Sequence, residues 1–421
     1  MNRIEAEKKF YLKDSSEIKE YAKQIGFVEL ESLQENDEYF TDLDLEFVKN
    51  RTCLRIRTTN DKELETTFKG QSVNFSSDYI KLENNIPMDV TSYMALNDLF
   101  AFLGYVSYCN VAKKRTLLSK RVEGYIYNIA LDEISAIGSF VEFEVLAKSS
   151  ITDLDKVRSE LNNLVGQFSS FALQEADEPY RDFVANALFD KFCPNGDVEC
   201  VLSDLDGTLI DSEYLFYEAT RNVLYGKYNI NITFDDYVAN ENEKNQNLVA
   251  YLKEKSLLDE NIDENDVFGA IYKEYDQLFP QVLKGKTMEI NFCLLKMLKK
   301  RGVKLALVST SKRYFINKLL TMMNIEDLFD VIVAREDVTC LKPSPEAYQK
   351  ALSILKINKN KCLVLEDSLR GVQSSIDAGI NTVLVEDYCQ HKQYNQEIEN
   401  KITRVSKLTN VILILLNYLK R

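Results

Sequence analysis

Ionisable side chains of both signs recur at every second position in short segments of the N-terminal part of the chain. Glu5, Glu7 and Lys9 follow this spacing in RIEAEKKFYL, and Arg55 and Arg57 follow it in CLRIRTT. Residues i and i+2 of a β-strand lie on one face of a sheet, and the residues between them lie on the other face. Because the intervening residues are mostly apolar, the pattern predicts strands with one charged face and one apolar face.

Residues 1–148 are dominated by such β-rich segments, which indicates an antiparallel β architecture. The predicted strands are at residues 3–13, 36–47, 51–58, 63–70, 77–86, 105–119, 122–133 and 139–147. Solvent exposure on a half-buried strand explains any single charged pair. The repetition on nearly every strand instead favours a closed sheet, with an apolar outer face beneath helices and a charged lumen.

Charged groups in an enclosed lumen are costly unless they are paired or bound to a ligand. Carboxylates bind hard divalent cations through oxygen, and lysine and arginine bind phosphate groups. The candidate metal ligands are Glu5, Glu7, Glu142 and Glu144. The candidate basic cradle consists of Lys9, Arg55, Arg57, Lys69, Lys113 and Arg115. A metal site beside a long basic cradle suits a triphosphate.

The segment Glu5-x-Glu7-x-Lys9 resembles the opening signature of the CYTH family, also called triphosphate tunnel metalloenzymes. Later segments follow in the order of that family: R-x-R, T-x-K, a basic-x-Glu strand, K-x-R, an aspartate and a closing E-x-E. The resemblance implies an α+β domain at residues 1–192, an eight-stranded antiparallel tunnel with flanking helices that binds a triphosphate with Mg²⁺ or Mn²⁺. Family members hydrolyse inorganic triphosphate, thiamine triphosphate or nucleotide and RNA 5′-triphosphates, and a few cyclise ATP.

The same resemblance implies roles for individual lumen residues. It supports the four glutamates named above as metal ligands, and it adds Glu83 and Asp132 as further tunnel acids. It also adds Lys81 to the triphosphate-binding set, at a position where arginine is more usual. Lysine keeps the charge there but lacks the bidentate fork of arginine.

The C-terminal half has a different sequence pattern, in which apolar runs alternate with helical stretches. This pattern predicts a doubly wound α/β fold at residues 197–421, after the breaker-rich stretch CPNGD. The strand CVLS is followed by Asp204-x-Asp206-Gly207, which places two carboxylates at the usual ligand crevice of such a sheet. An EF-hand loop is the alternative for this motif, but the preceding strand and the apolar residues Leu209 and Ile210 argue against it.

Three later segments complete a recognisable set. VKLALVSTSKR places Ser309 after a second buried strand, TCLKPSPEAY contains Lys342, and KCLVLEDSLRG ends a third strand in Glu366 and Asp367. Each segment alone is an ordinary β–α junction. Together with the first aspartate motif, they resemble the four ordered motifs of the haloacid dehalogenase (HAD) superfamily, in its β-phosphoglucomutase-like branch.

The HAD resemblance implies a helical cap at about 214–284 and a role for each motif residue. Asp204 would be the nucleophile that forms an aspartyl-phosphate, and Asp206 would be the general acid and base. Ser309 and Lys342 would hold the phosphoryl oxygens. The implied Mg²⁺ ligands are Asp204, Asp206 through its backbone carbonyl, Glu366 and Asp367.

Two departures from the mutases of this branch favour hydrolysis. The position where they often carry histidine after DSE reads Tyr214-Leu215-Phe216 here. No arginine that would grip a second phosphate from the cap is evident around residues 240–244.

Composition limits the partners and the compartment. The net charge is -14, from 66 acidic and 52 basic residues, which argues against nucleic-acid binding apart from an RNA 5′-triphosphate end. The 8 cysteines include no C-x-x-C pair, and the first residues are charged throughout. We therefore expect a cytoplasmic protein without membrane association that acts on small phosphorylated molecules.

These observations predict a bifunctional phosphohydrolase, a triphosphatase fused to a HAD phosphatase, with Mg²⁺ or Mn²⁺ in both domains. One alternative is an adenylyl-cyclase-like tunnel fused to a sugar-phosphate mutase. Another is a tunnel that senses polyphosphate and regulates the phosphatase.

Overall fold

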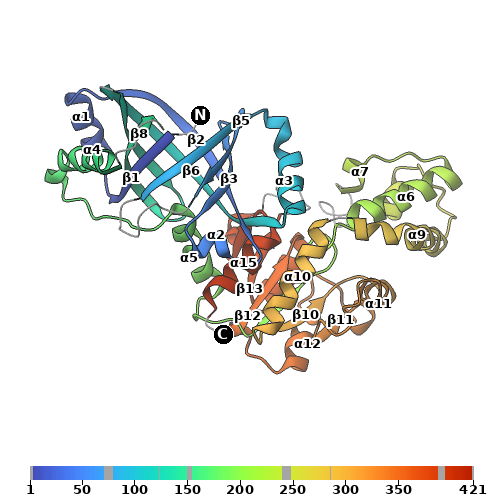
Figure 1. Ribbon diagram of the computed structural model, residues 1–421. Helices are drawn as coiled ribbons and strands as arrows, with labels where there is room; N and C mark the ends of the chain where they lie inside the picture. Colours follow the sequence, from blue (N-terminus) through green and yellow to red (C-terminus); the bar gives the residue numbers. More distant parts are fainter. Residues whose placement is uncertain are drawn as a thin grey trace. The chain divides into compact units, whose positions relative to one another are not determined.

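The alternating segments of the N-terminal half form a closed antiparallel barrel (Figure 1). The computed structural model describes residues 3–70, 79–122, 124–148, 154–238, 248–284, 286–386 and 394–419. The chain divides into two units, Met1–Phe189 and Asp190–Arg421. The barrel strands are β1 (Arg3–Leu12), β2 (Val28–Asp42), β3 (Cys53–Thr59), β4 (Glu63–Lys69), β5 (Tyr79–Met88), β6 (Tyr105–Val122), β7 (Tyr125–Ile134) and β8 (Gly138–Lys148).

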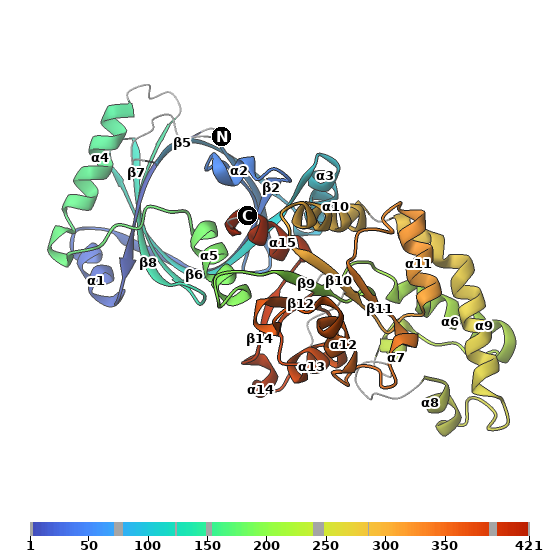
Figure 2. The ribbon, with the colours of Figure 1, turned by 90° about the horizontal axis from the view of Figure 1, so that it is seen from below.

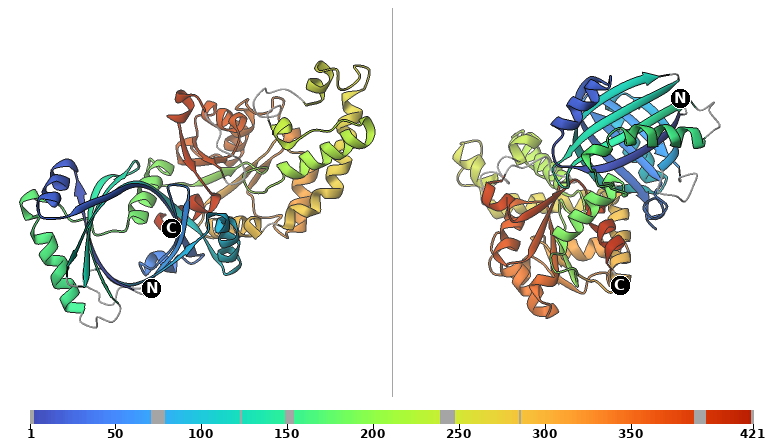
Figure 3. Two further views of the ribbon diagram at one scale, coloured as in Figure 1. Left: turned by 90° about the horizontal axis from the view of Figure 1, so that it is seen from above. Right: turned by 90° about the vertical axis from the view of Figure 1, so that its left-hand side faces the viewer.

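Around the barrel the strand order is β1-β5-β4-β3-β2-β6-β7-β8, and β8 pairs with β1. Figure 3 shows this ring of strands end-on in its left view. In the closing pair, Lys9 lies opposite Glu142 and Glu7 lies opposite Glu144. The predicted closed antiparallel sheet is therefore confirmed, and its first and last charged motifs are neighbours.

The apolar faces of the strands point outward and are covered by helices. Helix α1 (Ser16–Gln24) and helix α4 (Leu154–Gly166) lie over β1, β7 and β8 (Figure 2). Phe143 of β8 is fully buried there, and its ring centroid lies 4.8 Å from that of Phe168. A second apolar cluster on β2, β3 and β4 packs against α3 (Tyr93–Phe102). The alternation of the sequence thus sorts apolar residues to the outside and charged residues to the lumen.

The strand predicted at 36–47 is displaced, because β2 begins at Val28 and ends at Asp42. The carboxylate of Asp42 accepts hydrogen bonds from the backbone N–H groups of Asp44, Glu46 and Phe47. These bonds end the strand and start the short helix α2 (Glu46–Lys49). The unpredicted residues before position 36 are held in the sheet by pairing with β6.

The chain returns to the barrel after α4 and lines one end of the lumen. The backbone of residues 174–176 pairs with the last part of β1, where Tyr11 N–H donates to Gln174 and Ala176 N–H donates to Lys9. Helix α5 (Tyr180–Phe192) begins directly afterwards. The guanidinium of Arg181 in its first turn donates to backbone carbonyl oxygens of residues 47, 48 and 52, which fixes the helix start against the barrel.

The C-terminal unit is built on a six-stranded sheet of order β11-β10-β9-β12-β13-β14 in which all the strand pairs are parallel. The strands are β9 (Cys200–Ser203), β10 (Lys304–Val308), β11 (Val331–Val333), β12 (Cys362–Glu366), β13 (Asn381–Val385) and β14 (Ile402–Val405). The main helices around them are α10 (Lys286–Lys300), α11 (Arg313–Met322), α12 (Glu346–Leu355), α13 (Leu369–Asp377) and α15 (Leu408–Tyr418), with the short α14 (Gln396–Glu399) before β14. Figure 2 shows α12 and α13 on one side of the sheet and α10 and α15 on the other, which confirms the doubly wound prediction.

A helical insertion separates β9 from β10. It contains α6 (Glu213–Tyr228), α7 (Phe234–Val238), α8 (Leu248–Glu254), α9 (Glu264–Leu278) and a 3₁₀ segment (Phe279–Lys284). Helices α6 and α9 contact each other through the rings of Phe216 and Tyr275, whose centroids are 5.1 Å apart. This insertion occupies the segment where a helical cap is expected. Among the helices of the described residues, none combines the length and the apolarity that a membrane crossing needs.

We expect Phe143→Ala to lower the free energy of unfolding of the N-terminal unit by about 3–5 kcal/mol, because it leaves a cavity in a buried core. Phe102→Ala is the control, since Phe102 is 75% exposed and should change stability by at most about 0.5 kcal/mol. Urea unfolding of the full chain followed by circular dichroism measures both. Equal losses in the two variants would contradict the packing described above.

Candidate active sites

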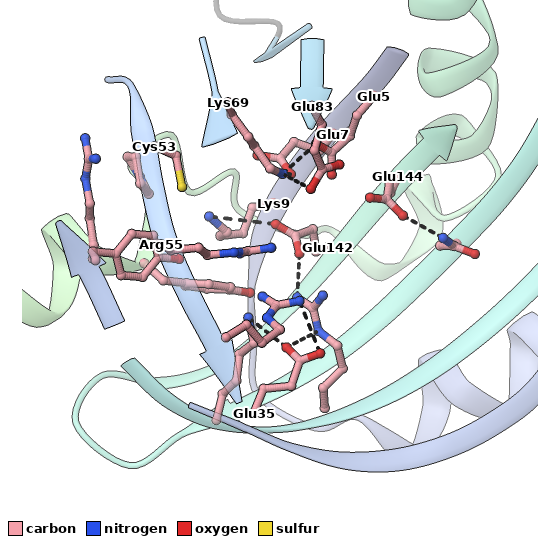
Figure 4. Close-up of a pocket in the computed structure, with 18 of the residues that line it drawn as sticks. Glu5, Glu7, Lys9, Glu35, Cys53, Arg55, Lys69, Glu83, Glu142 and Glu144 are labelled. Atoms are coloured by element: carbon pink, nitrogen blue, oxygen red, sulfur yellow. Dashed lines mark hydrogen bonds and ion pairs between the residues drawn. The ribbon is translucent and has the colours of Figure 1, made fainter. Parts of the chain in front are cut away.

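The barrel encloses a cavity of about 490 Å³ whose lining is mostly ionisable (Figure 4). The predicted lumen residues that line it are Glu5, Glu7, Lys9, Arg55, Arg57, Lys69, Glu83, Lys113, Arg115, Glu142 and Glu144. Asp132 is buried and accepts two hydrogen bonds from the lining residue Arg115. The side chain of Lys81 lies outside the described residues. The structure therefore brings nearly all of the predicted lumen residues to one cavity.

Among the described side chains of one part of the cavity, carboxylates gather around the ammonium group of Lys69. The Lys69 Nζ atom lies 2.5 Å from Glu5, 3.6 Å from Glu83 and 3.9 Å from Glu7. Burial raises the pKa of Glu5 well above its usual value, and the carboxylates of Glu7 and Glu83 raise it further against the opposing effect of Lys69. Oxygen ligands in excess of positive charge fit Mg²⁺ or Mn²⁺.

Of the four predicted metal glutamates, Glu5 interacts with both Glu7 and Glu144. Within the described part of the barrel, no three of its carboxylates offer oxygen atoms within 4.8 Å of one another. Glu144 accepts a hydrogen bond of 2.6 Å from Asn128, a residue that the motifs did not indicate. Glu142 lies instead among the basic residues.

A charge network around Arg115 joins β6, β7 and β8. Arg115 donates two hydrogen bonds to Asp132, of 2.7 and 2.6 Å, and one of 2.7 Å to Glu142. Burial opposes the ionisation of Glu142, but Arg115 and Lys9 lower its pKa to about 2. The hydroxyl of Tyr180 donates to Asp132 at 2.8 Å, and the Lys9 ammonium lies 3.9 Å from the centre of its ring. Asp132 therefore orients Arg115.

Two lumen carboxylates on β2 were missed by the sequence analysis. Glu35 and Asp37 face Arg57 and Lys113, with N–O distances between 2.5 and 3.2 Å. Their i, i+2 spacing was a signal that could have found them. The strand was predicted to begin only at residue 36, inside an acidic run that reads as solvent-exposed.

The second site lies at the carboxyl ends of β9, β10 and β12, which are adjacent in the parallel sheet. The ammonium group of Lys342 donates at 2.6 Å to Asp204, at 2.6 Å to Glu366 and at 2.8 Å to the carbonyl oxygen of Val308. Tyr348 donates to the same Glu366 oxygen at 2.6 Å. Although burial lowers the pKa of Lys342, the two carboxylates raise it above its usual value, so the lysine stays charged.

Asp204, Glu366 and Asp367 form a buried carboxylate cluster. One oxygen from each lies within 4.8 Å of the others. Burial raises the pKa of Asp204 well above its usual value, and the carboxylates of Glu366 and Asp367 raise it further against the opposing effect of Lys342. A divalent cation would relieve this repulsion, and the all-oxygen donor set fits Mg²⁺. The tight turn after the first motif uses Gly207 at a φ of +78°, where a Cβ atom would collide with Asp367.

The side chain of Asp206 is held by hydroxyl groups and is not a member of this cluster. Ser311 donates to it at 2.6 Å, Ser309 lies at 3.4 Å, and Ser212 makes a further short hydrogen bond. Tyr275 of α9 is hydrogen-bonded to Ser212. Ser311 and Ser212 were missed, because a serine at the start of a helix usually reads as a cap.

Each unit matches a known family. Residues 3–171 match the CYTH domain, and residues 201–385 match the haloacid dehalogenase-like hydrolase family. The chain belongs to the haloacid dehalogenase-like hydrolases and carries a CYTH domain in its N-terminal unit. It is accordingly a hydrolase that acts on phosphate esters, as predicted.

Individual relatives match the C-terminal unit. A phosphorylated carbohydrates phosphatase of Thermotoga maritima is 31% identical over 189 residues, which are 44% of this chain and 84% of the relative. Pyrophosphatase PpaX of Bacillus cereus is 29% identical over 192 residues, which are 45% of this chain and 83% of the relative. The solved structure of CbbY from Rhodobacter sphaeroides in complex with phosphate is 21% identical with a TM-score of 0.39, and the match covers 47% of this chain and 91% of that one.

We expect Gly371→Ala to reduce phosphatase activity by about 10²-fold, because a Cβ atom there would overlap the carboxylate of Glu366 and displace it. Gly226→Ala is the control, since no atom lies within 4 Å of the added methyl group. Phosphate release from a panel of monophosphates measures both variants. Wild-type rates in Gly371→Ala would show that the position of Glu366 does not matter for turnover.

Proposed function

We propose that this protein is a bifunctional phosphohydrolase. The barrel at residues 1–192 hydrolyses a triphosphate, and the unit at residues 197–421, with a helical cap at about 214–284, removes phosphate from a small metabolite through an aspartyl-phosphate. The observation that carries the second activity is the contact of Lys342 with Asp204 and Glu366, at the carboxyl ends of the adjacent strands β9 and β12. The observation that carries the first is the enclosed lumen in which carboxylates and basic groups face one another.

In the C-terminal site, Asp204 attacks phosphorus and the bond to the leaving oxygen breaks. Asp206, held by the hydroxyls of Ser212 and Ser311, gives its proton to that oxygen and then takes a proton from the water that hydrolyses the intermediate. Lys342 and Ser309 stabilise the transferring oxygens. Asp204, Asp367 and the backbone carbonyl of Asp206 would hold Mg²⁺, which neutralises phosphoryl charge when it is bound. Glu366 is placed to orient Lys342.

In the barrel, the basic residues orient the phosphate chain and neutralise the charge that spreads over it during transfer to water. The acidic group around Lys69 would hold Mg²⁺ or Mn²⁺, which supplies further charge neutralisation. Within the described lining, the aromatic side chains are Tyr39 and Tyr180. The Tyr180 ring faces the Lys9 ammonium, and the Tyr39 hydroxyl contacts Asp37 at 3.5 Å. Because both tyrosines already contact charged side chains, neither is free to stack on an aromatic group of a substrate. This supports inorganic triphosphate as the substrate over thiamine or nucleoside triphosphates.

Hydrolysis is favoured over mutase chemistry in the C-terminal site. Tyr214, at the position where related mutases often carry histidine, is 46% exposed. The names of the two relatives support pyrophosphate or a sugar phosphate as the class of substrate.

The two activities should be separable. We expect Glu142→Gln to reduce triphosphatase activity by about 10³-fold, because Arg115 and Lys9 lose the carboxylate that positions them. The phosphatase should be unchanged, because the charge is lost only in the lumen. Asp204→Asn should do the reverse, since it removes the nucleophile. Phosphate release from inorganic triphosphate and from monophosphates measures both. Loss of both activities in either folded variant would contradict independent sites.

Metal removal should abolish both activities. After exhaustive chelation we expect no phosphate release, because the clustered carboxylates of each site would repel the negatively charged substrate. Addition of Mg²⁺ or Mn²⁺ should restore phosphate release. Added Mg²⁺ should also raise the melting temperature of the wild type, and raise it less in a variant with both Asp367→Asn and Glu5→Gln. Full activity in the chelated protein would argue against a metal in either site.

A further inference from the structure

Asp37 connects three basic side chains of the lumen. It lies on β2 and is 0% exposed. Arg57 of β3 donates to both of its oxygens, at 2.5 and 2.8 Å. Lys113 of β6 donates at 3.0 Å, and Arg55 of β3 contacts it at 3.5 Å. A single carboxylate therefore fixes cations from the two strands that flank its own.

The charge balance around Asp37 leaves positive charge for a ligand. Burial opposes ionisation of Asp37, but Arg57, Lys113 and Arg55 hold its pKa well below the usual value, so it is charged. Glu35 supplies a second carboxylate, at 3.2 Å from Arg57 and 3.1 Å from Lys113. Among the described side chains, these two negative charges face Arg55, Arg57 and Lys113, and Arg115 also lies 3.9 Å from Glu35.

Arg55 is the member of this group with spare hydrogen-bonding capacity. Its Nε atom is buried and has no hydrogen-bond partner within the described residues. Its contact with Asp37, at 3.5 Å, is at the outer limit of a hydrogen bond, and the side chain lines the cavity. A buried, unpaired guanidinium donor is costly unless a ligand accepts from it. Phosphate oxygens are suitable acceptors.

We propose that Asp37 is a positioning residue of the triphosphatase, an inference that rests on the function proposed above. Asp37 anchors Arg57 and Lys113, and it holds the guanidinium of Arg55 at the cavity wall, where it can donate to a phosphate oxygen. Its role is orientation of donors and not attraction of the substrate, because its own charge opposes the binding of an anion.

Asp37→Asn separates the orientation of the donors from the attraction of the substrate. The substitution keeps the size of the side chain, removes one competing negative charge and ends the bidentate contact with Arg57. Ground-state binding of a polyanion depends mainly on net charge, whereas stabilisation of the transition state needs aimed donors. We therefore expect kcat for inorganic triphosphate to fall by more than about tenfold, while KM stays within about twofold or decreases.

Glu38→Gln is the matched control. Glu38 is the next residue on the same strand and is 2% exposed, but it faces away from the lumen and accepts a hydrogen bond of 2.6 Å from Tyr93. This variant also removes one buried carboxylate charge from β2, so it should share any general loss of stability. Its kcat and KM for triphosphate should equal those of the wild type.

The experiment measures kcat and KM of the full chain with inorganic triphosphate and Mg²⁺, with circular dichroism as the test of folding. If Asp37→Asn does not fold, Arg55→Lys tests the same geometry, since it keeps the charge and removes Nε, and it should show the same loss of kcat without a rise in KM. Unchanged kcat, or an increase in KM alone, would overturn the positioning role. A wild type that hydrolyses no triphosphate would instead refute the proposed activity, and this inference with it.

Discussion

Pairing of buried opposite charges is the interaction on which both sites depend. Lys69 faces Glu5 in the barrel, and Lys342 faces Asp204 and Glu366 in the α/β unit, at distances of 2.5 to 2.6 Å. Enclosing any of these groups alone would cost several kcal/mol, and removal of one partner from a buried pair typically costs about 3–5 kcal/mol. The barrel can therefore close around ionisable residues only because strands of opposite charge come to face one another.

Much of this arrangement could be predicted from the sequence, because local periodicity decides which face of a strand a residue occupies. The spacing of Glu5, Glu7 and Lys9 places all three in the cavity. The position of Asp204 and Ser309 after short apolar strands places them at one edge of the parallel sheet. These inferences need only the two-residue period of a strand and the common direction of parallel strands.

The partners of each charge could not be predicted, since they depend on which strands become neighbours. Glu142 and Glu144 share a motif, but Glu142 pairs with Arg115 and Lys9 whereas Glu144 accepts from Asn128. Asp37 was missed for a related reason. A polar residue in an acidic run reads as exposed until the closed barrel places basic strands on both sides of it.

The lumen contains an acidic group of side chains around Lys69 and a basic group around Asp37, and a ligand that fills the lumen must suit both. Among the described side chains, carboxylates exceed cations around Lys69, whereas cations exceed carboxylates around Asp37. A free polyanion would be repelled by the first group, and a free divalent cation by the second. A metal–polyphosphate complex carries both signs and satisfies both groups at once. The same reasoning applies to the C-terminal site, where Lys342 lies beside the carboxylates of Asp204 and Glu366, so that a metal ion would ease the approach of a phosphate. Charge segregation of this kind would favour such a complex over either component alone, in line with the proposed triphosphatase activity.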